Sequence, residues 1–318
     1  MNRQFTVALM LLSAIALFLP TRSQTFTRVA VEGRVMRMLV SGTGESTVVF
    51  ENGLGPPLEM WGKVQPHVSR FAGTVTYDRA GVGFSEDGPS PRDGHQIARE
   101  LRDALRAAGL PPPYVLVGAS LGGLYIRVFA GTYPEDVSGM VLVDPTHDAN
   151  GFERSLHPEL AVVRETAEQA RRSRIPPGVP LVLIDAVSQR EVPFAISAIR
   201  ELRAKNRPEI DAESRAYKTW LDTIPGARLI VTHESGQNVP IEQPLLVVET
   251  IREIVRPQVI GLDNSQFDSE ITSAGAVEHL DYAAMRVEQT GFSSSTAVPP
   301  VGLWASRSLL HRRYPWSA

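Results

Sequence analysis

The chain has 318 residues, 43% of them hydrophobic, and is therefore long enough to bury a sizeable core. Its 35 acidic and 32 basic residues give a net charge of -3 without long runs of one sign. This balance excludes the basic surface expected of a nucleic-acid-binding protein. The chain has no cysteine, which excludes disulfide bonds, thiolate metal ligands and a cysteine nucleophile. A small neutral partner fits this composition best.

The N-terminus has the pattern of an export signal. Arg3 precedes an apolar run from Phe5 to Leu19, and Thr21 and Ser23 supply small residues at a cleavage boundary after Ser23. The run is shorter than the roughly 20 apolar residues that a membrane-spanning helix needs, so an uncleaved anchor is the weaker interpretation. The sequence thus predicts that residues 1–23 are a signal peptide, removed on export to the periplasm or the medium, and that no stable membrane span remains.

Strand-like and helix-like segments alternate after the signal. Residues 29–40 alternate around Gly33 as a hairpin does. Later β-branched and apolar runs predict strands at 47–50, 74–77, 114–117, 140–143, 181–184 and 228–232. Apolar residues recurring at intervals of three and four predict helices at 58–71, 96–108, 121–132, 160–172 and 243–255. This order predicts an α/β fold with a doubly wound, mostly parallel sheet over residues 24–257.

Two segments depart from the alternation. Residues 187–226 are polar and helix-prone, and we expect a small helical insertion there, before the last strand, that roofs a pocket. Residues 258–318 gather Ser, Thr and Pro around 293–300, which predicts an irregular, largely disordered C-terminal tail with one helix over 277–287.

One motif carries recognisable chemistry. Gly118-Ala119-Ser120-Leu121-Gly122 matches G-x-S-x-G, follows a predicted strand and opens a predicted helix. That is the setting of a nucleophile elbow, where small neighbours let a strained serine stand on a sharp turn. The alternative is a glycine-rich turn without chemistry. We expect Ser120 to be the nucleophile.

Three segments together resemble the α/β-hydrolase superfamily, in its esterase and lipase-like branch. They are Phe50-Glu51-Asn52-Gly53-Leu54-Gly55, Tyr77-Asp78-Arg79-Ala80-Gly81-Val82-Gly83-Phe84-Ser85 and Val117-Gly118-Ala119-Ser120-Leu121-Gly122-Gly123. Their order and spacing are those of the family, and the resemblance extends over about residues 29–256. It implies the α/β-hydrolase fold and attack by a serine on an acyl substrate.

The resemblance also implies an oxyanion site made of backbone N–H groups. By position these are Leu54, in the loop after the first parallel strand, and Leu121, directly after the nucleophile. Each fixed donor can contribute about 3 kcal/mol to a tetrahedral transition state. Asp78 and Arg79 are expected to be architectural, fixing the neighbouring loop by charge-assisted hydrogen bonds.

Two aspartates compete for the role of the catalytic acid. Asp144 ends the predicted strand 140–143, which resembles hydrolases that carry the acid after their sixth strand. Asp185 ends the next strand, where other members of the superfamily carry theirs. Asp144 is favoured, because the loop that follows it resembles that of exported relatives. The structural alternative is that either aspartate caps a turn.

The position of the catalytic histidine departs from the family. The segment 235–244 resembles the last catalytic loop, whose third residue is normally histidine, and that residue is Gln237. A glutamine amide cannot accept the serine proton near neutral pH, so general-base activation would be lost. Three histidines are candidates to replace the base: His233 first, at the end of the last strand, then His147 and His279.

The expected function is a serine hydrolase acting on a small carboxylic ester or related acyl substrate. Ser120 attacks, Asp144 orients the base, and His233 is the first candidate for that base. No metal and no organic cofactor is implied. The alternative is a catalytically impaired member of the fold that binds a small apolar ligand, and Gln237 favours it. The sequence does not indicate an oligomeric state.

The export signal generates a first test. Intact-mass measurement on protein from the native host should show a chain that lacks its first twenty-odd residues, because a signal peptidase acts near Ser23. Cytoplasmic protein that still begins with Met1 would contradict this expectation.

Overall fold

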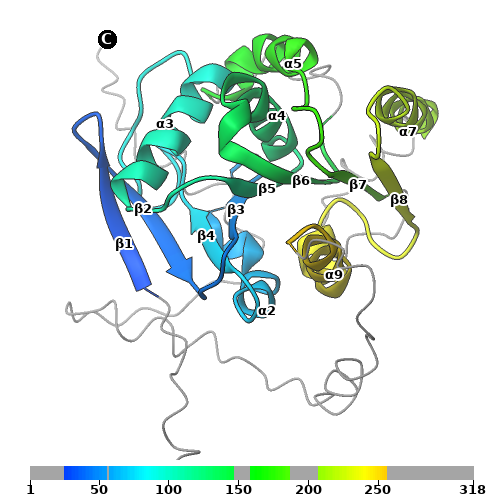
Figure 1. Ribbon diagram of the computed structural model, residues 1–318. Helices are drawn as coiled ribbons and strands as arrows, with labels where there is room; N and C mark the ends of the chain where they lie inside the picture. Colours follow the sequence, from blue (N-terminus) through cyan, green and yellow to red (C-terminus); the bar gives the residue numbers. More distant parts are fainter. Residues whose placement is uncertain (1–24, 56, 147–157, 187–206, 256–318) are drawn as a thin grey trace, which may run out of the picture. The chain divides into compact units, whose positions relative to one another are not determined.

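The computed structural model describes residues 25–55, 57–146, 158–186 and 207–255, which form a sheet with helices on both faces (Figure 1). The sheet has eight strands in the order β1-β2-β4-β3-β5-β6-β7-β8. The predicted signal peptide, the C-terminal tail with its helix at 277–287, His147 and His279 lie outside the described residues.

The parallel part of the sheet is flanked by a hairpin at one edge. β1 (Thr25–Val31) pairs antiparallel with β2 (Arg34–Ser41), and β2 pairs antiparallel with β4. All later neighbours pair in parallel. The parallel strands are β3 (Thr47–Glu51), β4 (Gly73–Tyr77), β5 (Tyr114–Ala119), β6 (Val137–Val143), β7 (Leu181–Ala186) and β8 (Arg228–Thr232). The predicted hairpin and mostly parallel sheet are confirmed.

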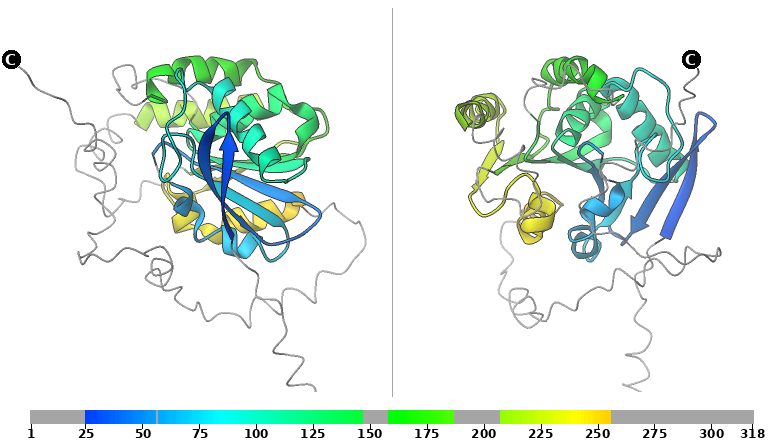
Figure 2. Two further views of the ribbon diagram at one scale, coloured as in Figure 1. Left: turned by 90° about the vertical axis from the view of Figure 1, so that its left-hand side faces the viewer. Right: turned by 180° about the vertical axis from the view of Figure 1, so that it is seen from behind.

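The helices divide between the two faces of the sheet. One face carries α3 (Gly94–Ala107), α4 (Gly122–Thr132) and α5 (Val163–Arg172), whereas α2 (Gln65–Val68) and α9 (Pro244–Val255) cover the other (Figures 1 and 2). Short helices connect them: η1 (Leu58–Trp61), η2 (Pro134–Asp136), η3 (Leu160–Val162) and α8 (Val239–Glu242). In the predicted insertion, the part that the structure describes contains α7 (Arg207–Leu221), which lies beside β8 (Figure 1).

The core consists of two apolar layers that the central strands separate. Along β5, Tyr114 and Leu116 pack into the layer under α3, α4 and α5, whereas Val115 and Val117 pack into the layer under α2 and α9. Side chains of a strand point alternately to opposite faces, so a strand covered on both sides must be apolar throughout. This explains why the central strands appear in the sequence as continuous apolar runs.

The predicted helix at 58–71 is wrong in its continuity. The structure has η1, ending at Trp61, and a separate α2, in which Pro66 takes the second position. Proline has no backbone N–H to donate and its ring blocks a preceding helical turn, so it is tolerated at a helix start and not in the interior. The other predicted helices are present with bounds shifted by one or two residues, or divided at Val163 into η3 and α5.

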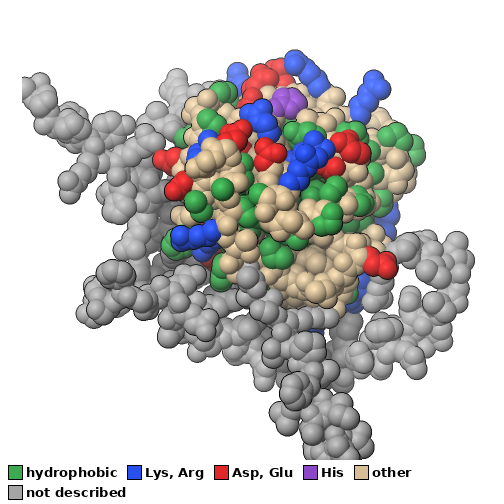
Figure 3. Space-filling model, turned by 60° about the vertical axis from the view of Figure 1, so that its left-hand side comes forward, with side chains coloured by type: hydrophobic (Ala, Val, Ile, Leu, Met, Phe, Trp, Pro, Cys, Tyr) green, Lys and Arg blue, Asp and Glu red, His purple; other side chains and the backbone are tan. Residues whose placement is uncertain are grey.

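The surface carries charges of both signs. On the face in Figure 3, Lys and Arg side chains stand beside Asp and Glu side chains, and no large area of one sign is visible among the described residues of that face. Within the same described part of the chain, no helix combines the length and the apolar character needed to cross a membrane.

The layered core generates a stability test with a matched control. Leu142 is fully buried in β6. Its replacement by alanine should lower the free energy of unfolding by about 2 to 5 kcal/mol, because the change leaves a cavity. The same replacement of Leu245, 58% exposed on α9, should change it by less than about 0.5 kcal/mol. Urea unfolding of both variants measures the difference, and equal effects would contradict the observed packing.

Candidate active site

Ser120 stands on a sharp turn between β5 and α4, as the sequence predicts. Its φ angle is +50°, a left-handed conformation that costs a non-glycine residue about 1 to 3 kcal/mol. The backbone holds this conformation: the Ser120 N–H donates to the Val143 carbonyl (3.1 Å), and the Ser120 carbonyl accepts from the N–H groups of Gly123 (3.0 Å) and Thr146 (2.9 Å). The turn leaves the Ser120 side chain partly exposed at the carboxyl end of the sheet.

Glycines bring two other segments against this turn. A Cβ atom on Gly122 would lie 2.5 Å from the Glu51 carbonyl oxygen, so only glycine lets α4 begin this close to the end of β3. A Cβ atom on Gly53 would lie 3.2 Å from the Ser120 Cβ. The loop after β3 is therefore in contact with Ser120. Within the described residues, the N–H groups of Leu54 and Leu121 donate no hydrogen bond, as an oxyanion site requires.

Gln237 lies directly beside Ser120. Its Nε2 donates a hydrogen bond to the Ser120 Oγ (3.2 Å), and the Thr146 Oγ1 lies 3.4 Å from the same oxygen. The segment that resembles the family's histidine loop thus reaches the serine. An amide nitrogen offers protons and accepts none, so this contact does not activate the hydroxyl.

The loop that presents Gln237 is fixed by polar contacts at both ends. The Ser235 Oγ donates to the Gln243 Oε1 (3.0 Å), and the Gly236 N–H donates to the Glu242 Oε2 (2.8 Å). Gln243 in turn donates to the Glu234 Oε2 (2.9 Å). His233, at the beginning of this loop, is exposed and forms no hydrogen bond with Ser120. Of the three histidine candidates it is the one that the structure describes.

Both candidate acids lie at the carboxyl end of the sheet, near Ser120 in the strand order. Asp144 directly follows β6; its N–H donates to the Ile184 carbonyl (2.7 Å) and its Oδ1 accepts from the Ala186 N–H (3.2 Å). Its φ angle is +40°. Among the described non-glycine residues, the others with a positive φ angle are Ser120 and Glu32, which lies in the β1–β2 turn. Asp185 is buried in β7, and its Oδ2 has no hydrogen-bond partner in the described part of the chain. The strained backbone at Asp144 favours it as a functional residue.

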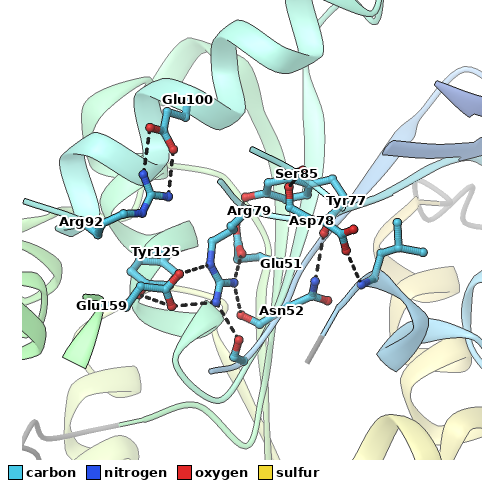
Figure 4. A network of polar contacts seen from close by, with 12 residues as sticks. Glu51, Asn52, Tyr77, Asp78, Arg79, Ser85, Arg92, Glu100, Tyr125 and Glu159 are labelled. Atoms are coloured by element: carbon cyan, nitrogen blue, oxygen red, sulfur yellow. Dashed lines mark hydrogen bonds and ion pairs between the residues drawn. The ribbon is translucent and has the colours of Figure 1, made fainter. Parts of the chain in front are cut away.

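A buried arginine ties the loop after β3 to the rest of the site (Figure 4). The Arg79 side chain is 1% exposed, and its Nη1 donates to the Glu51 Oε1 and to the Asn52 carbonyl, both at 2.7 Å. Its Nη2 donates to the Gly53 carbonyl (2.8 Å), and Nε and Nη2 hold the two Glu159 oxygens (2.8 Å each). These contacts agree with the architectural role expected of Arg79.

Asp78 fixes a second set of loops next to this network. Its Oδ2 pairs with the Arg37 Nε (2.7 Å) and accepts from the Phe84 N–H (3.0 Å), and its Oδ1 accepts from the Leu58 N–H (2.9 Å). One fully buried carboxylate therefore links β2 to the first residue of η1 and to the segment after β4. Asp78, too, is architectural, as expected.

Burial and charge shift the pKa values of the Arg79 network. Burial raises the pKa of Glu51, although Arg79 and a hydrogen bond from the Tyr77 hydroxyl act in the opposite direction. Burial also raises the pKa of Tyr125, and the neighbouring Glu159 raises it further. For Arg79, burial acts to lower the pKa, but Glu159 and Glu51 outweigh it, so the pKa is raised and the guanidinium stays charged.

Sequence reasoning missed three residues of this arrangement. Glu51 is a charged residue at the end of an apolar strand, which is a usable signal of a buried ion pair. Thr146 follows Asp144 closely and reaches Ser120 only because the chain folds back over the turn. Glu159 lies in a polar stretch without a motif, and nothing in the sequence marks it.

A hollow lies elsewhere on the surface of the described residues. A cavity of about 420 Å³ between α3, α4 and α5 is lined by side chains of both charge signs, among them His95, Glu165 and Arg172. None of its lining residues belongs to the group around Ser120. Its size does not identify it as the functional site, since it holds neither the strained serine nor the strained aspartate.

The buried Glu51 generates a test of stability against pH. A carboxyl whose folded pKa is raised stabilises the fold below its ordinary value of 4.5 and loses this contribution as pH rises through the folded value. Glu51→Gln keeps the shape and removes the titration. The free energy of unfolding of both proteins is measured with urea. The value for the variant, minus the value for the unchanged protein, should therefore increase between pH 4.5 and pH 8. A difference that shrinks over this interval would contradict the raised pKa.

Comparison with known proteins agrees with this architecture. The family model described as alpha/beta hydrolase fold matches residues 46–177. The chain is 38% identical over 104 residues to the uncharacterized protein YqjL of Bacillus subtilis, which is 33% of this chain and 41% of the relative. It is 29% identical over 118 residues to the putative carbamate hydrolase RutD of Azorhizobium caulinodans, 36% of this chain and 43% of the relative. The matched segments thus span less than half the length of these relatives.

A solved structure extends the likeness beyond the share of the chain that the family model matches. A predicted CIB-like hydrolase from Thermoplasma acidophilum superposes with a TM-score of 0.51 at 20% identity, over 74% of this chain and 98% of that chain. At this identity the match shows the fold alone. Together with the strand order, the serine turn and the family model, it shows that the chain has the α/β-hydrolase fold.

Proposed function

We propose that this protein is a serine hydrolase of low intrinsic activity, acting on a small carboxylic ester or related acyl compound. The observation that carries the proposal is Ser120, held at a φ angle of +50° between β5 and α4 with Gly53 against its side chain. A strained serine persists only where the surrounding structure fixes it, and such strain is concentrated at functional sites.

In the proposed reaction the Ser120 Oγ attacks the substrate carbonyl carbon. The N–H groups of Leu54 and Leu121 bind the resulting oxyanion, the alcohol leaves, and water then hydrolyses the acyl-serine ester. Asp144 is the proposed acid of the site, but the side chain beside Ser120 is the Gln237 amide in place of an imidazole. The Ser120 proton therefore passes to water, and the leaving alkoxide takes a proton from water. Catalysis without a triad member retains about 10³ to 10⁴ of rate over the uncatalysed reaction.

The hydrolase names of related proteins support the reaction class. The relative from Azorhizobium caulinodans is called a putative carbamate hydrolase, and hydrolysis of a carbamate also proceeds by attack on a carbonyl carbon. The substrate of this chain is proposed only as far as that class, a small acyl compound.

A second function is favoured by one contact. Because the Gln237 Nε2 donates to the Ser120 Oγ, it engages one of the two lone pairs of that oxygen and lowers its nucleophilicity, which suits a catalytically impaired protein that binds a small apolar ligand. In that case Ser120 is a contact residue and not a nucleophile. Covalent labelling of Ser120 by a fluorophosphonate distinguishes the two functions, since it requires an activated serine and no knowledge of the substrate.

The proposal places this activity outside the cytoplasm. Its support is Arg3 and the apolar run from Phe5 to Leu19, which have the pattern of a cleaved export signal.

The missing base generates the decisive test. Gln237→His should raise the hydrolysis of a short-chain nitrophenyl ester by on the order of 10², because it restores a general base beside Ser120. The gain depends on Asp144 being close enough to orient the new imidazole. Initial rates of the unchanged protein and the variant at neutral pH measure it, and Ser120→Ala gives the background.

His233→Ala is the matched variant for the rival base. If His233 already serves, its replacement should abolish activity while Gln237→His gives little. If neither the unchanged protein nor Gln237→His hydrolyses esters or is labelled at Ser120, the hydrolase proposal is wrong and ligand binding remains.

A further inference from the structure

The Arg79 guanidinium has five N–H groups, and the structure gives each of them an acceptor. Two acceptors are the carbonyl oxygens of Asn52 and Gly53, and the others are carboxylate oxygens of Glu51 and Glu159. The rigid plane of the guanidinium therefore transmits the position of the two carboxylates to two consecutive peptide units. Those peptide units belong to the loop that touches Ser120.

The bond to the Gly53 carbonyl sets the direction of a neighbouring N–H. A trans peptide unit is planar, and its C=O and N–H groups point in opposite directions. Gly53 C=O and Leu54 N–H belong to the same unit. Because the Arg79 Nη2 holds the Gly53 oxygen at 2.8 Å on one side, the Leu54 N–H is directed to the other side.

Glu159 is the group that places the guanidinium. It accepts two bonds from Arg79 in a bidentate arrangement, and its Oε2 also accepts from the Tyr125 hydroxyl (3.2 Å) of α4. Its side chain is 2% exposed, so water does not compensate for its loss. Glu51, the other carboxylate, contacts Arg79 through one oxygen and the Tyr77 hydroxyl through the other.

We infer that Glu159 is a positioning residue: by fixing Arg79 from the helical face, it aims the Leu54 N–H at the substrate oxygen above Ser120. This inference rests on the proposed function of the site for its catalytic consequence, but not for its structural content. Without Glu159 the guanidinium keeps its bonds to Glu51, Asn52 and Gly53 but loses the two that hold Nε and Nη2 from the helical face, so its plane can turn. The Gly53–Leu54 peptide unit then loses its fixed orientation.

The experiment compares Glu159→Gln with Glu168→Gln. Glu168 also pairs with an arginine, Arg172, but it is 46% exposed on α5 and belongs to another part of the surface. The first readout is the NMR order parameter of the Leu54 N–H, which needs no catalysis. We expect it to fall from about 0.85, typical of rigid backbone, to below about 0.6 in Glu159→Gln, and to stay unchanged in Glu168→Gln. The order parameters of β5 and β6 should stay at their original values.

The second readout separates positioning from general destabilisation. The background is the unchanged protein if it hydrolyses esters, and otherwise Gln237→His. In that background, Glu159→Gln should lower kcat about tenfold and change KM less than twofold, because the Leu54 N–H acts on the transition state. An unaltered Leu54 order parameter in folded Glu159→Gln would overturn the inference. If that variant does not fold, Tyr125→Phe removes one bond to Glu159 and should lower the same order parameter by a smaller amount; no change there overturns it equally. Failure of the hydrolase proposal would appear separately, as absence of Ser120 labelling.

Discussion

The burial of one positive charge determines the geometry of this site. A guanidinium removed from water must be surrounded by anions and carbonyl oxygens, and Arg79 is surrounded by two carboxylates and two peptide carbonyls. The acceptors come from the end of β3, the loop after it and the segment before η3. Segments far apart in sequence therefore meet at fixed distances beside Ser120. A neutral side chain at position 79 would remove the guanidinium that pairs with both carboxylates.

The fold could be predicted because its signals are local and repeated. Continuous apolar runs such as Met140 to Val143 mark strands covered on both faces, and G-x-S-x-G marks the turn at Ser120. The prediction failed for the helix at 58–71, where apolar periodicity continues through Pro66 although a helix cannot. The spacing of apolar residues alone does not show that one residue in the segment lacks a backbone N–H.

The residues of the candidate site could be predicted only where they lie in a recognisable sequence motif. Ser120 and Gln237 lie in motifs that resemble the family, and the structure places them in contact. Glu159 and Thr146 lie in no motif, and their partners are Arg79 and Ser120, which the fold brings near. Pairings of this kind depend on where two loops cross, and the identity of a single residue does not contain that information. Asp144 and Asp185 lie at the carboxyl ends of adjacent strands. The sequence therefore favoured Asp144 as the acid but did not rule out Asp185.

The loop that presents Gln237 has a consequence for the history of the protein. Ser235, Gly236, Glu242 and Gln243 hold the loop through contacts that do not involve the Gln237 side chain. The residue at position 237 can therefore change without rebuilding its support. Histidine and glutamine codons differ only in their third base, so a single-nucleotide mutation exchanges a proton acceptor for an amide on an intact scaffold. Natural selection could thus move such a protein between hydrolysis and ligand binding in one step and in either direction.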